Sequence, residues 1–175
     1  MFENVFAECI KSSEGQACIF DKCPLFVKCY PEEYKKCKES DPKLVVVAGG
    51  FDPLHHGHVR HILAAKELGD ILIVIVGTDK HMIMKKGFVF MPFEQRMEII
   101  SAIKGVDDVQ ECIDLDGTVT ETLKLLRPDI MAKGGDRTPE TMPASEIEMC
   151  KKIGCKIVYG VGGDKVQSSS KLVKR

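Results

Sequence analysis

The sequence has no long apolar run and no export signal. None of its hydrophobic stretches reaches the roughly 18 residues that a membrane-spanning helix needs. Its N-terminus, MFENVFAECIK, also lacks the basic start and apolar core of a signal peptide. A formal net charge of −1 at pH 7 leaves no general excess of positive charge for holding nucleic acid or an anionic membrane, although a local basic site stays open. We therefore expect a cytoplasmic protein that binds neither nucleic acid nor membrane.

The chain also lacks internal repeats, low-complexity segments and the length for two catalytic domains. Its 175 residues, 44% hydrophobic and 29% charged, suit one ordinary globular α/β domain with a small appendage. The composition changes near Asp41, because five of the eight cysteines fall in the first 40 residues. We predict two parts, a cysteine-rich N-terminal extension of residues 1–42 and an α/β domain of residues 43–175.

The extension contains no histidine and no C-x2-C pair of the kind found in common zinc ribbons. Five thiols in so short a segment are typical of a small fold that needs a covalent or metal link. Without histidine the ligation would be all-thiolate, so we predict one zinc ion or iron–sulfur cluster, and Pro24 after Cys23 favours the cluster. Redox disulfides and packed, unligated thiols are the alternatives. The predicted ligands are Cys9, Cys18, Cys23 and Cys29, with Cys37 as the alternate.

Beyond the extension, short apolar runs alternate with segments of helical period, which is the pattern of a doubly wound parallel sheet. We expect strands at 44–48, 71–76, 106–111, 129–132 and 156–159, and helices at 58–68, 92–104, 119–126 and 143–153. The first two strands are apolar on both faces, as in central strands covered by helices on either side. The fold class is therefore α/β with a five-stranded parallel sheet, whose ligand site lies at the carboxyl ends of the strands.

The turn after the first strand carries the clearest chemistry. Residues 49–58, GGFDPLHHGH, lead from the strand into a helix, where paired glycines let the backbone approach a ligand and the helix N-terminus attracts anions. His55 and His58 flank Gly57 at i and i+3, so their imidazoles converge and can donate hydrogen bonds to a phosphate. The stretch is neither a Walker A loop nor a G-x-G-x-x-G fingerprint. The sequence thus predicts a phosphate site of another kind.

This turn resembles the G-x-F-D-x-x-H-x-G-H signature of the cytidylyltransferase-like nucleotidyltransferases. The resemblance continues in order with KG at 86–87, EQRM at 94–97, KGGD at 133–136 and SSS at 168–170. The KGGD segment is similar to that of the adenylyltransferase domain of bifunctional ADP-heptose synthases. The likeness spans residues 43–175 and implies a Rossmann-like nucleotidyltransferase.

The resemblance implies transfer of AMP or CMP from a nucleoside triphosphate to a phosphorylated acceptor, with release of pyrophosphate. Catalysis would be positioning and charge stabilisation, with Mg²⁺ bridging triphosphate oxygens. His55, His58 and Lys86 would be catalytic, with Lys86 on a mobile loop, and Arg96 and Arg137 would be possible phosphate contacts or surface cations. The implied nucleotide-binding residues are Gly49, Gly50, Phe51, Asp52, Gly57, Lys133, Gly134, Gly135, Asp136, Ser168, Ser169 and Ser170.

Several alternatives stay open. The KGGD likeness favours ATP with a sugar phosphate as acceptor, while CTP with glycerol 3-phosphate and FAD synthesis from FMN are variants. A hydrolytic metal site near Asp52 and His61 is another reading of the histidine-rich turn. A nucleotide-binding regulator that senses redox state or metal is an alternative of another class. We also predict a homodimer, because the family likeness is joined by apolar residues beside the site, namely Met84, Phe88, Val89, Phe90 and Met91.

Overall fold

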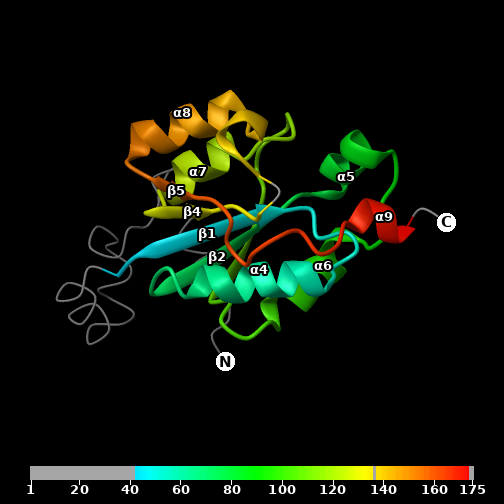
Figure 1. Ribbon diagram of the computed structural model, residues 1–175. Coiled ribbons are helices and arrows are strands. Elements are labelled where there is room, and N and C mark those ends of the chain that lie inside the picture. The colour runs from blue at the N-terminus through cyan, green and yellow to red at the C-terminus, as the bar shows by residue number, and fades with distance from the viewer. Residues whose placement is uncertain (1–41, 136, 174–175) are drawn as a thin grey trace, which may run out of the picture.

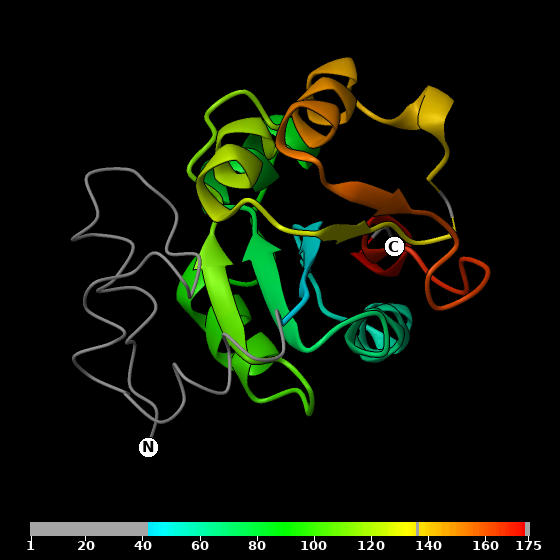
Figure 2. The ribbon, with the colours of Figure 1, turned by 90° about the vertical axis from the view of Figure 1, so that its left-hand side faces the viewer.

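Five parallel strands form the centre of the fold. The structure, a computed structural model, describes residues 42–135 and 137–173, and every structural statement below concerns these residues. The strands pair in the order β3-β2-β1-β4-β5, as Figure 2 shows. All four pairings are parallel, which confirms the predicted α/β class. The strands are β1 (Leu44–Gly49), β2 (Ile71–Val76), β3 (Asp108–Glu111), β4 (Ile130–Ala132) and β5 (Lys156–Val158).

Helices cover both faces of the sheet (Figure 1). Val45 and Val74 pack with α4 (His56–Lys66) and α6 (Phe93–Ser101), while Val46 and Ile73 pack with α7 (Thr120–Leu126) and α8 (Ala144–Ile153). The side chains of β1 and β2 alternate between these two apolar layers, which explains why neither strand alternates hydrophobic with polar residues. The prediction of central strands buried on both faces is confirmed.

The sequence missed one helix beside the ligand-binding edge. α5 spans Asp79–Lys86, where we expected a loop, and that expectation was wrong for these residues. The helix follows Thr78, in extended conformation, and ends at Gly87, whose φ of 83° permits the left-handed C-cap with its N–H bonded to the Ile83 carbonyl. Only His81 and Met82 of this helix are buried, because α5 lies over the edge of the sheet and not against the core. The stretch DKHMIMKK therefore has no clear apolar stripe, and hydrophobic periodicity could not predict the helix.

Two further short elements complete the described fold, the 3₁₀ turn η2 (Pro139–Thr141) and α9 (Ser169–Val173). Both α5 and α9 lie beyond the end of the sheet toward which the β1 arrow points in Figure 1. They therefore flank the edge at which a parallel sheet of this kind binds its ligands. Among the helices of the described residues, none is long and apolar enough to cross a membrane.

Two sets of predicted site residues fall outside the described part of the chain. These are Asp136 and the predicted metal ligands Cys9, Cys18, Cys23, Cys29 and Cys37.

Candidate active site

A cleft of about 250 Å³ opens at the carboxyl edge of β1 and β4. Its walls come from the turn after β1, the first turns of α4, the end of α5, the loop after β4 and the loop that leads from β5 into α9. These segments are far apart in sequence, and the parallel topology brings them to one edge. The predicted residues that line the cleft are Gly49, Gly50, Phe51, Asp52, His55, Gly57, His58, Lys86, Lys133, Gly134, Gly135, Arg137, Ser168, Ser169 and Ser170.

His55 and His58 stack at the start of α4. Their ring centroids lie 3.7 Å apart with an interplanar angle of 14°. Each backbone N–H points at the other residue's ring, since His58 N lies 3.4 Å from Nδ1 of His55 and His55 N lies 3.3 Å from Nδ1 of His58. In a neutral ring whose Nδ1 accepts a backbone N–H, the hydrogen is on Nε2. The convergence predicted from the i, i+3 spacing thus has a local cause, a reciprocal helix cap in which each Nδ1 accepts a backbone N–H.

Gly57 leaves space for the stacked histidines, and Phe51 packs against one of them. A Cβ on Gly57 would lie 3.1 Å from Cε1 of His55, so a side chain there would crowd the stack. Phe51 packs edge-on against His58, with ring centroids 5.0 Å apart, and takes a φ of 52° that few non-glycine residues adopt. Strained backbone of this kind persists where the surroundings hold it and is common at functional sites.

The charge state of His55 suits a hydrogen-bond donor. Burial, together with the charges of Lys165 and His56, lowers the pKa of His55 below its usual 6.5. Its imidazole is therefore neutral at pH 7.

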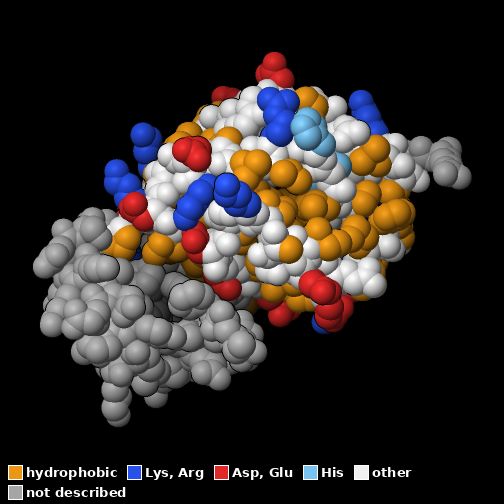
Figure 3. Space-filling view, turned by 90° about the horizontal axis from the view of Figure 1, so that it is seen from below, with side chains coloured by type: hydrophobic (Ala, Val, Ile, Leu, Met, Phe, Trp, Pro, Cys, Tyr) orange, Lys and Arg blue, Asp and Glu red, His pale blue; other side chains and the backbone are white. Residues whose placement is uncertain are grey.

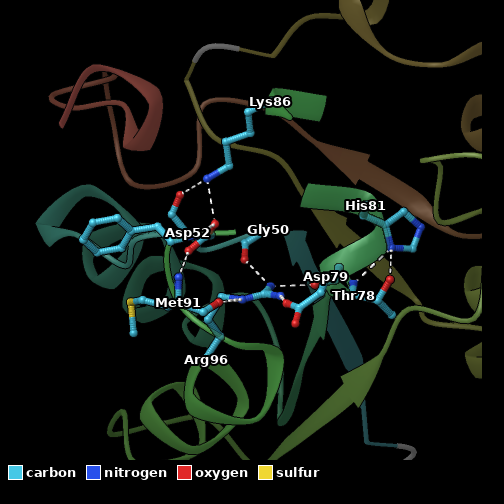
Figure 4. Close-up of polar contacts among 10 residues, drawn as sticks. Gly50, Asp52, Thr78, Asp79, His81, Lys86, Met91 and Arg96 are labelled. Carbon is cyan, nitrogen blue, oxygen red and sulfur yellow. Dashed lines mark hydrogen bonds and ion pairs between the residues drawn. The ribbon is translucent and has the colours of Figure 1, made fainter. Parts of the chain in front are cut away.

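Asp52 and Lys86 form a buried ion pair across the cleft wall (Figure 4). The Lys86 ammonium lies 2.8 Å from the Asp52 carboxylate and also donates to the Asp52 backbone carbonyl. The same carboxylate accepts the N–H groups of Phe90 at 3.0 Å and Met91 at 2.6 Å. Burial alone would raise the pKa of Asp52, but the Lys86 pair and these two bonds outweigh it and hold that pKa below its usual value. Asp52 thus holds Lys86 and the segment after α5 against the turn.

Arg96 is neither an exposed surface cation nor a residue that lines the cleft. It is 1% exposed, so it is not a surface cation, and its guanidinium hydrogen-bonds within the protein and not in the cleft. It donates to the carbonyls of Gly50, Gly77 and Met91 and forms a 2.6 Å ion pair with Asp79, as Figure 4 shows. Arg96 therefore joins the ends of β1 and β2 to α5 and α6, and the structure gives it a scaffolding role.

Lys133 and the glycines after β4 form the opposite wall. Lys133 pairs with Glu146 of α8 at 3.0 Å, with both side chains largely buried. A Cβ on Gly135 would lie 2.4 Å from the Gly163 carbonyl oxygen, so the loop after β5 packs directly on the glycine backbone. Ser169 at the start of α9 donates to the Pro53 carbonyl at 3.0 Å, which ties the serine segment to the turn after β1. Arg137 is exposed and donates to the Thr141 carbonyl at 3.2 Å.

The cleft also contains residues that were not predicted as nucleotide-binding. Arg60 and His61 reach it from α4, and Asp164 and Lys165 reach it from the loop before α9. His61 entered the sequence analysis only as part of the alternative metal site, and its Nδ1 lies 2.9 Å from the Val161 carbonyl. One signal was available, since Arg60 and His61 lie at most one helical turn beyond His58 on the same helix.

The cleft is electropositive. Among the described residues that line it, the carboxylates are Asp52 and Asp164, and Asp52 is already paired with Lys86. The cations are Arg60, Lys85, Lys86, Lys133, Arg137 and Lys165. A surplus of cations around histidine side chains suits a polyanion such as a triphosphate.

Within residues 42–135 and 137–173 no three histidine, cysteine, aspartate or glutamate side chains come together as metal ligands. The alternative of a hydrolytic metal site at Asp52 and His61 therefore finds no support in the described geometry.

Fold and cleft together define an α/β protein with a cation-rich cleft at the carboxyl edge of its parallel sheet. Residues 46–173 match the cytidylyltransferase-like family, and the chain belongs to it. It is therefore a nucleotidyltransferase, as the resemblance implied.

Curated relatives and one solved structure agree with this assignment. The chain is 39% identical over 138 residues to the FAD synthase of Pyrococcus abyssi, a match that covers 75% of this chain and 90% of the relative. It is 35% identical over 124 residues to the bifunctional protein HldE of Hahella chejuensis, covering 70% of this chain and 24% of that protein. A lipopolysaccharide core biosynthesis protein of Thermoplasma volcanium superimposes with a TM-score of 0.57 at 29% identity, over 67% of this chain and 95% of the other.

Proposed function

We propose that this chain transfers AMP from ATP to the phosphate of FMN, forming FAD and pyrophosphate. The observation that carries the proposal is a pair of adjoining hollows at one edge of the sheet. Next to the electropositive cleft lies a second hollow of about 360 Å³, and the two share the backbone of Gly49 and Gly50 and the side chains of Met82 and Lys133. A donor in the first hollow and an acceptor in the second would therefore meet at the end of β1.

In the proposed reaction an oxygen of the FMN phosphate attacks the α-phosphorus of ATP. A new phosphoanhydride bond forms, the bond from the α-phosphorus to the oxygen bridging to the β-phosphorus breaks, and pyrophosphate leaves. The Nε2–H groups of His55 and His58 would donate to triphosphate oxygens and stabilise the charge that develops on them. No side chain needs to form a covalent intermediate, so the chain contributes by positioning both substrates and by charge stabilisation.

Two further groups complete this proposal. Mg²⁺, when bound, would neutralise triphosphate charge. Lys86 would contact the phosphates after exchanging its Asp52 partner for them, since its ammonium lies on the cleft wall at the end of α5.

Two observations favour FMN over the sugar phosphate that the sequence analysis preferred. The match to the Pyrococcus abyssi FAD synthase covers 90% of that protein, whereas the match to HldE covers 24% of a larger one. The wall of the second hollow also contains the apolar side chains of Met82, Met84 and Val119. Thioether and aliphatic walls suit a flat ring system better than a polyhydroxylated sugar.

A sugar phosphate remains the second candidate, because HldE is among the relatives and the Lys133-Gly134-Gly135 segment carried the resemblance to ADP-heptose synthases. CTP as donor with glycerol 3-phosphate as acceptor is the variant suggested by the family description.

The test is pyrophosphate release from each of the four nucleoside triphosphates, with FMN, sugar 1-phosphates and glycerol 3-phosphate as acceptors. We expect release only with ATP and FMN, accompanied by FAD on chromatography. Turnover of a sugar 1-phosphate without turnover of FMN would replace the proposal by the second candidate. Absence of pyrophosphate with every pair, in protein shown to bind ATP, would favour the regulatory alternative.

A further inference from the structure

One buried side chain in the second hollow lacks a partner. His81 is 8% exposed, and its Nε2 is shielded from solvent with no hydrogen-bond partner among the described residues. A buried polar nitrogen left unbonded lowers stability, so such groups are few in folded proteins and call for an explanation. His81 lines the hollow together with Met82 and Met84 of the same helix and with Asp116 and Thr118 of the loop after β3.

The hydrogen of the His81 ring can be placed from its contacts. Nδ1 lies 3.0 Å from the backbone N of Thr78 and 2.9 Å from the Thr78 hydroxyl, both visible in Figure 4. The backbone N–H can only donate, so Nδ1 is an acceptor and the neutral ring carries its hydrogen on Nε2. The unpartnered atom is thus a hydrogen-bond donor, and what it lacks is an acceptor.

No neighbouring carboxylate supplies that acceptor in the described structure. Asp116 lines the same hollow, but its carboxylate accepts the Thr118 N–H at 2.9 Å and the Thr118 hydroxyl at 2.8 Å. Glu146, on the far wall, is paired with Lys133. The lone donor is therefore available to a ligand.

The wall opposite α5 is built before any ligand binds. Asp114, 5% exposed, accepts the N–H groups of Glu121 at 2.7 Å and Thr122 at 3.0 Å and the Thr122 hydroxyl at 2.6 Å. These bonds tie the loop after β3 to the first turn of α7. On the other side, Met84 of α5 lines the hollow and is 61% exposed, and its unbranched thioether can adapt its shape to a ligand at little cost.

We propose that the second hollow binds the body of the acceptor substrate and that His81 determines its specificity by donating from Nε2 to an uncharged oxygen or ring nitrogen. The acceptor class is a phosphorylated molecule whose body carries an uncharged oxygen or a heteroaromatic nitrogen, with Met82 and Met84 against that body. This inference rests on the proposed function for the nature of the reaction. The phosphate of the acceptor substrate would lie toward Lys85, Lys133 and Arg137, which line both hollows.

Two substitutions separate the two nitrogens of the ring. His81→Asn keeps an oxygen where Nδ1 accepts the Thr78 N–H and removes the donor at Nε2. His81→Gln places an amide N–H near Nε2 and removes the acceptor for Thr78. A hydrogen bond of this kind corresponds to a change of about tenfold in affinity.

The measurement is FMN binding by flavin fluorescence, in the presence of a non-hydrolysable ATP analogue, with melting temperature recorded in parallel. We expect the Kd for FMN to rise about tenfold in His81→Asn and to stay within about threefold in His81→Gln. The melting temperature should fall more in His81→Gln than in His81→Asn, because only His81→Gln loses the acceptor for the Thr78 N–H at the start of α5. Equal FMN affinity in His81→Asn and the parent chain, or equal weakening in both variants, would overturn the assignment.

A second arm separates this inference from the proposed function. If the ATP analogue binds and FMN does not, the choice of FMN has failed, and the titration is repeated by calorimetry with glucose 1-phosphate and glycerol 3-phosphate. Weakening of whichever probe binds in His81→Asn alone supports the role of His81. Binding of that probe without any dependence on His81, or binding of no phosphorylated probe, refutes it.

Discussion

The Lys86 ammonium lies 2.8 Å from the carboxylate of Asp52, a residue 34 positions earlier in the chain. The Asp52 side chain is fully buried, and that of Lys86 is 11% exposed. The Asp52 carboxylate therefore holds the Lys86 ammonium in place. It also fixes the chain after α5, because it accepts the Phe90 and Met91 N–H groups.

Replacing Asp52 by Asn should destabilise the fold by about 3 kcal/mol, because it leaves a largely buried ammonium without its counter-charge. The free energy of unfolding from urea titration measures this. Glu121→Gln is the matched control, since it breaks the exposed pair with Lys124, whose side chains are 57% and 59% exposed. We expect the control to cost less than about 0.5 kcal/mol. Equal effects of the two substitutions would contradict the assigned role of Asp52.

The destabilisation caused by Asp52→Asn should depend on pH. The pKa of Asp52 is lower in the folded chain than its reference value of 3.8, so its contribution is complete above that value and is lost as the pH falls through the folded pKa. The difference in unfolding free energy between parent and variant should thus be constant from about pH 7 to pH 5 and shrink in stronger acid. Urea titrations at several pH values test this, and a difference that grows on acidification would have the wrong sign.

His58→Ala should lower kcat by about a hundredfold or more, and His55→Ala should do so to a lesser degree, with the fold intact, because each removes a donor to the triphosphate. His58→Asn keeps a cap for the His55 N–H and should lose activity almost as fully. His56→Ala is the control, since His56 is exposed and does not line the cleft. Steady-state pyrophosphate release is the measurement, and full activity of His58→Ala would remove His58 from the mechanism.

The apolar surface beside the site should form a homodimer interface. Figure 3 shows hydrophobic side chains gathered on the underside, toward the end of the molecule that carries α9. Met84, Phe88 and Phe90 are 61%, 43% and 57% exposed. Light scattering should give a dimer for the parent chain and a monomer for Phe90→Ser, while Leu115→Ser, at an exposed residue outside this set, stays dimeric. A parent chain that is monomeric at high micromolar concentration would refute the interface.

The N-terminal cysteines should hold one metal centre. Elemental analysis of anaerobically purified full chain should give about one zinc, or about four irons with matching sulfide. The double substitution Cys9→Ser with Cys18→Ser should abolish it, whereas Cys150→Ala, at a buried cysteine of α8, should leave it unchanged. A metal content below about a tenth of an equivalent would leave disulfides or packed thiols as the explanation.

The sequence by itself determined the sheet and the histidine-rich turn after β1. The runs LVVVA and ILIVIV are apolar at every position, as expected of short strands covered by helices on both faces. In the structure these runs form β1 and β2. The stacking of His55 and His58 was also predictable, because i, i+3 spacing around a glycine is a local property of one helix start.

Tertiary structure alone decided what depends on contacts between distant segments. Arg96 was predicted as a surface cation or a phosphate contact. In the structure its guanidinium donates to the carbonyls of Gly50, Gly77 and Met91, and no local sequence pattern predicts that these three groups meet. The Asp52 partner of Lys86 and the unpartnered Nε2 of His81 have the same origin, since both depend on how α5 lies over the sheet edge. Periodicity reports which face of an element is apolar, but the pairing of buried polar groups depends on three-dimensional packing.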